Sequence, residues 1–153
     1  MKKFLALSLI GAVTLASCNQ ANVTGSSKTY TFAAQAQTGY TVQAGTAART
    51  DLNTGDTSTV LKATGLKPST AYIAHYHLAG ADVSKGVCAS GGAVQNGLIG
   101  GTNFTSDASG NLTIKGLAST ADIAVGSVQY INIHEAATPA VVPLCADLTV
   151  AAK

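Results

Sequence analysis

The sequence is poor in the residues on which many functions depend. It has no Trp, one Met, three Cys and three His, and only 10% of its 153 residues are charged. A chain with so few basic residues lacks the positive surface that proteins use to hold nucleic acid. The single Met is the initiator, which excludes the Met-rich clusters common in carriers of copper(I).

The remaining composition is apolar and rich in turn-forming residues. Hydrophobic residues make up 46% of the chain, and there are 16 Gly but only three Pro. A chain of this length and hydrophobicity can fill the core of one ordinary domain. Many Gly, Thr, Val and Ala with few charges favour an all-β domain over a helical one.

Eight short runs of β-branched, apolar and aromatic residues follow one another with no helical stretch between them. They cover residues 29–36, 40–47, 57–64, 70–78, 98–104, 111–116, 128–134 and 144–151. Turn signals separate them, for example at 53–56 and 107–111. We therefore expect an all-β fold, an eight-stranded antiparallel β-sandwich or barrel.

The N-terminus has the pattern of a bacterial export signal. Lys2 and Lys3 precede an apolar run that is too short to cross a bilayer as a helix. Leu15-Ala16-Ser17-Cys18 matches the lipoprotein signal, in which Cys18 is lipidated and becomes the first mature residue. The alternative is plain secretion, with cleavage near Cys18.

This pattern predicts a signal peptide over 1–17, a lipidated cysteine and tether over 18–28, and a β-sandwich domain over 29–153. The protein would then be an extracytoplasmic lipoprotein of the cell envelope, anchored to a membrane through Cys18. Removing Lys2 and Lys3 takes the formal charge from +2 to 2 − 2 = 0. We expect no nucleic-acid partner for such a chain.

Two of the three histidines lie two residues apart in the strand expected over 70–78. Alternate side chains of a strand share a face, so His75 and His77 point the same way, with Cβ atoms roughly 6.5 to 7 Å apart. His134 lies in the strand expected over 128–134, where polar and apolar residues alternate. We expect these three side chains to hold one metal ion. The alternative for each is a surface or hydrogen-bonded core histidine.

Lipidation of Cys18 would leave two cysteines, Cys88 and Cys145. An oxidising compartment favours a disulfide between them. Closing a loop of roughly 58 residues would stabilise the fold by about 4 kcal/mol in the chain-entropy model. The alternative is that they are thiolate ligands of zinc or copper(I), although the chain has no Cys-x-x-Cys pair.

Short motifs in a fixed order resemble the copper/zinc superoxide dismutase family over residues 29–151. They are Gly65-Leu66-Lys67-Pro68, His75-Tyr76-His77, Gly80, Cys88-Ala89-Ser90-Gly91-Gly92, Asp107-Ala108-Ser109-Gly110-Asn111-Leu112, Ile133-His134-Glu135 and Cys145. The resemblance implies an eight-stranded Greek-key sandwich and a disulfide from the long loop to the last strand. It also implies one copper ion held by His75, His77 and His134.

Departures from the family pattern indicate its copper-only branch. The position of the histidine that bridges copper and zinc is Val94, and no histidine is left for a zinc site, so we expect no zinc. The position of the arginine that guides superoxide is Val142. Only ten residues separate His134 from Cys145, which would leave the copper more open to solvent, and Tyr76 is larger than the residue usual between the paired histidines.

The same ligands are compatible with several functions. One is a copper-only superoxide dismutase, with superoxide as its substrate and no catalytic residue beyond the metal ligands. Another is a non-enzymatic copper buffer or carrier at the cell envelope. A third is a metal-free sandwich used as an adhesion or scaffold module. Homodimers are common in the family, so a second copy of this chain is a further candidate partner.

Overall fold

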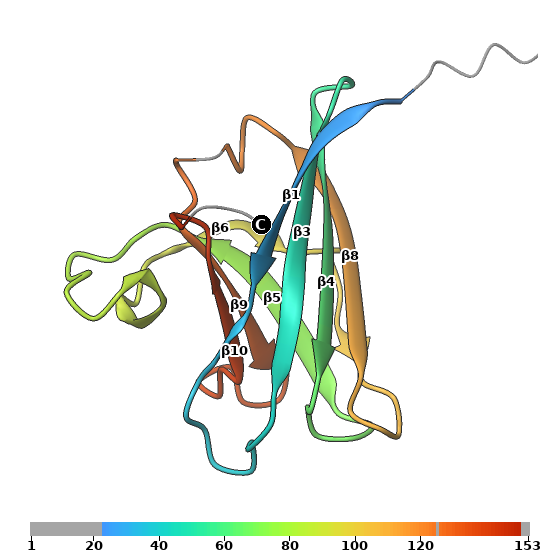
Figure 1. Ribbon diagram of the computed structural model, residues 1–153, viewed down its shortest axis with the longest axis vertical. Helices are drawn as coiled ribbons and strands as arrows, with labels where there is room; N and C mark the ends of the chain where they lie inside the picture. The colour runs from blue at the N-terminus through green and yellow to red at the C-terminus, as the bar shows by residue number, and fades with distance from the viewer. Residues whose placement is uncertain (1–22, 125, 151–153) are drawn as a thin grey trace, which may run out of the picture.

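A computed structural model describes residues 23–124 and 126–150 (Figure 1). The expected signal peptide over 1–17 and the lipidation site Cys18 lie outside these residues. Within them no helix is long and apolar enough to cross a membrane. Helical structure in the described chain amounts to one 3-10 turn, η1 (Val87–Ala89).

The described strands form two antiparallel sheets that face each other (Figure 1). The first sheet has the order β1 (Gly25–Thr31), β3 (Ala44–Leu52), β4 (Asp56–Thr64), β8 (Leu112–Ser119). The second has the order β2 (Ala33–Ala34), β10 (Leu144–Asp147), β9 (Tyr130–Glu135), β5 (Ala71–His77), β6 (Val94–Leu98), with β7 (Phe104–Thr105) also paired to β5. The expectation of an antiparallel all-β fold is confirmed, and over the described residues the sheets do not close into a barrel.

Alternating burial in the first sheet and fully buried apolar side chains in the second place the core between the two sheets. In the first sheet, Leu61 of β4 and Ile114 of β8 are completely or almost completely buried, while the two residues that flank Ile114 are exposed. In the second sheet, Ile131 and Ile133 of β9 and Leu144 of β10 have no exposed surface. Burying each such side chain contributes roughly 1.5–3 kcal/mol, so this core fixes how the sheets lie against each other.

The strand expected over 40–47 is wrong in position, because the chain pairs only from Ala44 and then continues to Leu52. Tyr40 instead turns inward. Its hydroxyl donates a hydrogen bond to the Glu135 carboxylate and accepts one from Tyr72, with oxygens 2.6 and 2.8 Å apart. A buried tyrosine hydroxyl needs such partners, and they hold residues 40–43 away from the sheet ladder.

The strand expected over 98–104 is a turn between two strands. Gly100 and Gly101 have φ angles of +80° and +70°, which reverse the chain, and the Gly101 N–H donates to the Leu98 carbonyl at 3.0 Å. Only Leu98 and Phe104, at the two ends, belong to β6 and β7. Two consecutive glycines in the left-handed region are typical of a turn.

A disulfide joins Cys88 in η1 to Cys145 in β10, with Cα atoms 5.9 Å apart. The predicted pairing is confirmed, and the alternative that these cysteines are thiolate metal ligands is wrong. The bond fixes the long segment between β5 and β6 against the second sheet. Further contacts close this segment at its base, where the Leu78 N–H donates to the Ala93 carbonyl at 2.9 Å.

Removing this disulfide is expected to destabilise the fold. In Cys88→Ala/Cys145→Ala the free energy of unfolding, measured by urea denaturation, should fall by about 2–5 kcal/mol, because the unfolded chain regains the entropy of the opened loop. A reductant should produce a similar loss in the unsubstituted protein and none in the double variant. Equal stability of the oxidised and reduced proteins would contradict this prediction.

Candidate metal centre

The candidate metal centre lies on the outer face of the second sheet, on the neighbouring strands β5 and β9. In their antiparallel register His75 is opposite Asn132, and His77 is opposite Tyr130. The side chains of Tyr72 and Tyr76 on β5 are buried in the core, so the residues that alternate with them face outward. His75, His77 and His134 therefore share one face, as the sequence predicts.

The ring nitrogens of the three histidines come close enough to share a metal ion. One nitrogen from each ring lies within 4.8 Å of the other two, and Nδ1 of His75 is 3.5 Å from Nε2 of His77. Nitrogens bound at about 2.1 Å are about 4.2 Å apart on opposite sides of an ion and about 3.6 Å apart at 120°, so a pair 4.8 Å apart must close by about 0.6 to 1.2 Å to share one ion.

Backbone carbonyls orient two of the rings toward the same point. The Nδ1–H of His77 donates to the Gly92 carbonyl at 2.9 Å, and the Nδ1–H of His134 donates to the Pro139 carbonyl at 2.6 Å. In this tautomer each Nε2 carries a free lone pair, and Nε2 of His134 is buried with no hydrogen-bond partner. Metal-binding histidines typically have their second nitrogen fixed in this way.

Tyr130 also holds the ring of His77 in place. The two rings stack with centroids 4.6 Å apart and planes inclined by 7°, and the Gly92 N–H donates to the Tyr130 hydroxyl at 2.9 Å. The sequence assigned no role to Tyr130 or Pro139, and Gly92 entered only as the last residue of the motif that begins at Cys88. The alternation that places His134 on the outer face also places Tyr130 there, so the signal for this one residue was present in the sequence.

Burial keeps the three histidines neutral. It lowers the pKa of His75 to about 4, with the neighbouring His134 and His77 adding to the effect. Burial also lowers the pKa of His77 and of His134, partly offset by their hydrogen bonds to backbone carbonyls. Neutral imidazoles are the form that binds metal ions, so the ligands are ready to bind at neutral pH.

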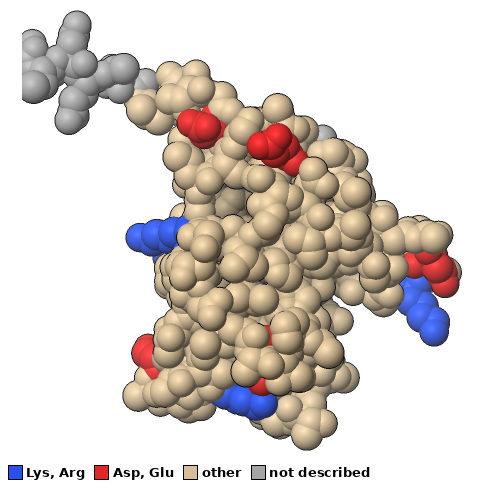
Figure 2. All heavy atoms as spheres, turned by 180° about the vertical axis from the view of Figure 1, so that it is seen from behind, with Lys and Arg blue, Asp and Glu red and all other residues tan. Residues whose placement is uncertain are grey.

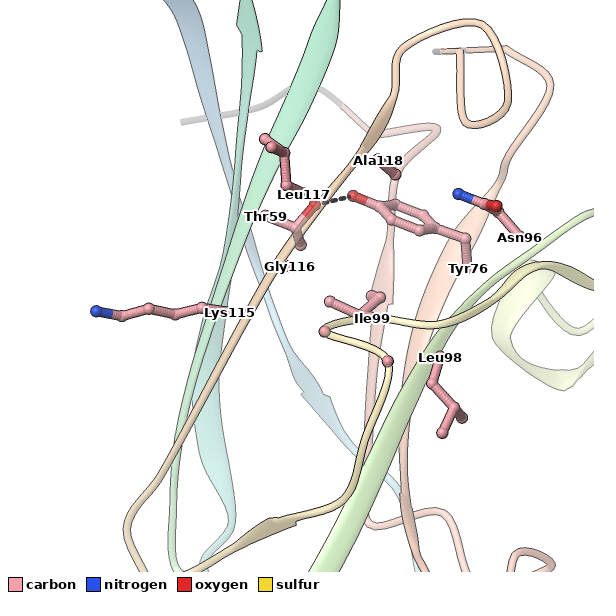
Figure 3. A pocket seen from close by; sticks show the side chains of 11 residues that line it. Thr59, Tyr76, Asn96, Leu98, Ile99, Lys115, Gly116, Leu117 and Ala118 are labelled. Carbon is pink, nitrogen blue, oxygen red and sulfur yellow. Dashed lines mark hydrogen bonds between the residues drawn. The ribbon is translucent and has the colours of Figure 1, made fainter.

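Tyr76 lies on the other face of β5, away from the histidines. It lines a cavity of about 500 Å³ between β6 and β8, and its hydroxyl is 2.6 Å from that of Thr59 (Figure 3). The guanidinium of Arg49 is 5.2 Å from the centre of the Tyr76 ring, and Arg49 is only 2% exposed. The single arginine of the chain is therefore in the core, behind the sheet that carries the candidate metal centre.

Charge is sparse on the molecular surface. On the face seen in Figure 2 the acidic and basic side chains are few, and at one edge an acidic and a basic side chain lie next to each other. Val94 is the cross-strand partner of His77 and is 48% exposed. His75 is the most exposed of the three histidines, since His77 and His134 are only 7% and 8% exposed. His75 is therefore the ligand candidate most open to solvent.

Gly92→Ala is expected to disrupt the centre, because a Cβ at this position would lie 1.8 Å from the Leu78 carbonyl oxygen. The shift needed to relieve this clash would move the carbonyl that orients His77. We expect metal affinity, measured by competition with a chelator, to fall about 10- to 100-fold. Gly91→Ala is the matched control, since its Cβ would meet no atom within 4 Å. It should cost about 1 kcal/mol of stability through its positive φ and keep metal affinity.

The metal-free protein is expected to lose stability as the pH falls. The folded state holds His75 neutral down to about pH 4, whereas the unfolded chain binds a proton near pH 6.5. Since the unfolded state binds more protons in this window, the free energy of unfolding decreases from pH 6.5 toward pH 4. Urea denaturation at pH 7 and pH 5 measures this decrease, and His75→Gln should reduce it. A pH-independent stability would contradict the prediction.

Comparison of the sequence with models of known protein families and with curated proteins found no match. The donors of the centre are three neutral imidazoles, two of them fixed by backbone carbonyls, on the outer face of an antiparallel sheet.

Proposed function

We propose that this protein is a copper-binding lipoprotein of the cell envelope that dismutes superoxide. The observation that carries the proposal is the unprotonated Nε2 of both His77 and His134. In each ring the Nδ1–H donates to a backbone carbonyl, and Nε2 of His77 lies 3.5 Å from Nδ1 of His75. Three neutral imidazoles suit copper in both of its common oxidation states. Because the chain has no fourth histidine, the protein is proposed to bind one copper ion and no zinc ion.

The topology supports the resemblance to copper/zinc superoxide dismutases. β8 pairs with β4, and β9 pairs with β5, so strands far apart in sequence are neighbours in each sheet. Such crossovers are compatible with the Greek-key arrangement that the resemblance implies. The disulfide from the long loop to β10 supports it as well, and so does the outward position of the three histidines.

The proposed location rests on the lipoprotein signal and on the disulfide. A stable bond between Cys88 and Cys145 is typical of an oxidising compartment outside the cytoplasm. Acyl chains on Cys18 would hold the domain at the membrane surface, each buried methylene contributing about 0.8 kcal/mol. The segment between Cys18 and β1, which begins at Gly25, is then the connection to the membrane.

His75, His77 and His134 would hold the copper ion, which would supply the one-electron redox chemistry by which two superoxide anions and two protons become O2 and H2O2. The residues of the chain would bind the ion and leave it accessible to a small substrate. His77 and His134 are fixed by their carbonyl partners, while the more exposed His75 leaves an approach for a small anion. Protons come from solvent, since no bridging histidine is present to supply one.

A copper buffer or carrier is the second candidate, and the position of Arg49 favours it. This arginine is buried among Tyr76, Asp51 and the Ile123 carbonyl, on the inner side of the second sheet. It is the only arginine of the chain, so no guanidinium is available at the centre to attract and orient superoxide. Steering by charge raises association rates 10- to 1,000-fold. Without a steering arginine the protein would react with superoxide more slowly, which suits a copper store better than a fast enzyme.

The test is superoxide dismutation per bound copper, followed by stopped flow with the copper content determined on the same sample. We expect one copper per chain and a rate constant about 10- to 1,000-fold below the diffusional ceiling of about 10⁹ M⁻¹s⁻¹. Because fixed charge is sparse, the rate should change little with ionic strength.

His75→Ala should lose copper and activity together. Ile73→Val, which alters the neighbouring outward side chain of β5 without removing a ligand, should keep both. One tightly bound copper with no turnover above that of His75→Ala would support the buffer or carrier. A protein that binds no metal would support the scaffold module.

A further inference from the structure

Asn132 places a fourth polar side chain among the three histidines. It lies two residues before His134 and two after Tyr130, so all three side chains leave β9 on the same outer face. Across the ladder it is the direct partner of His75 on β5. Side chains of such pairs have Cβ atoms about 4.5–5.5 Å apart, which is within reach of a shared ion.

The amide oxygen of Asn132 is buried without a partner. The residue is only 6% exposed, and no hydrogen bond to its Oδ1 is present within the described part of the chain. Leaving a buried acceptor unsatisfied destabilises the folded state. Such groups are rare in folded proteins, and a bound ion is one of the usual reasons for them.

The two strands that flank Asn132, β10 and β5, indicate on which side the missing partner of Oδ1 lies. On the side of β10 its cross-strand partner is Cys145, whose sulfur is bonded to Cys88 and has no hydrogen to donate. On the side of β5 its partner is His75, one of the three ligand residues. Of the two strands that flank Asn132, β5 is therefore the one that offers a polar side chain, and that side chain belongs to the candidate metal centre; η1 also lies close to β9.

We propose that Oδ1 of Asn132 is the fourth contact of the metal ion, made from the floor of the three-histidine site. This inference rests on the proposed function, since it requires an ion between the histidines. An amide oxygen is a harder donor than an imidazole nitrogen and prefers the more highly charged ion. Asn132 would therefore bind copper(II) more strongly than copper(I) and stabilise the oxidised form of the centre.

The test uses the purified full-length protein and Asn132→Leu, which keeps a similar volume and removes both polar atoms. Copper(II) and copper(I) affinities are measured by competition with chelators specific for each ion. We expect the copper(II) affinity to fall at least about tenfold, with copper(I) affinity little changed. The copper(II) electron paramagnetic resonance spectrum should also change, which a purely structural role would not produce.

Asn132→Asp and Ile73→Val complete the set. Asn132→Asp keeps an oxygen donor and adds a charge, so it should bind copper(II) at least as tightly as the unsubstituted protein. Ile73 is opposite His134 on the same face, and Ile73→Val should leave affinities and spectrum unchanged. If Asn132→Leu does not fold, Asn132→Asp tests the contact instead. An unchanged copper(II) electron paramagnetic resonance spectrum in that variant would overturn the proposed contact.

The two proposals fail in different ways. If the unsubstituted protein binds no copper, the proposed function itself is wrong, and the role of Asn132 is overturned with it. If the protein binds copper and folded Asn132→Leu has the same copper(II) affinity and spectrum, only the contact from Asn132 is overturned.

Discussion

The register between β5 and β9 is the constraint on which the candidate centre depends. Ile73 pairs with His134 and His75 with Asn132, while Ala74 and Ile133 form the completely buried pair between them. Because side chains alternate across a strand, a slip of one residue would exchange the core side chains of a strand for its outward ones. The apolar core therefore fixes the positions of the ligands: the energy that buries Ile131 and Ile133 also holds His134 beside His75.

The long segment after β5 connects stability with the site. Its disulfide to β10 and the hydrogen bonds of Gly92 hold it against the second sheet, and Gly92 is also the residue whose carbonyl orients His77. Gly80 has the same close approach, since a Cβ there would lie 1.8 Å from the Ser90 carbonyl oxygen. A segment without regular structure is thus rigid where it touches the histidine, which lets it act as part of the centre.

Sequence reasoning predicted the features that depend on residue type and spacing. The i, i+2 histidine pair, the two cysteines and the succession of short apolar runs were enough for the all-β fold, the disulfide and the grouping of three histidines. It could not predict the carbonyls of Gly92 and Pro139, because a backbone carbonyl is present at every position and leaves no mark in the sequence. The inward turn of Tyr40 and the core position of Arg49 depend on partners that only the packed sheets bring near.

Because Arg49 is buried in the core, it cannot guide superoxide to the candidate metal centre, and the attraction must come from another charge. Arg49 is on the core side of the sheet, and the groups proposed to hold the ion are three neutral imidazoles and the amide of Asn132. If copper(II) binds as proposed, none of these donors cancels its charge, so the centre itself carries about two positive charges in a partly buried site. Charge is screened less there than on an open surface. A superoxide anion approaching past His75 would then be attracted by the ion it reacts with, and a fixed guanidinium would increase that attraction without being its only source.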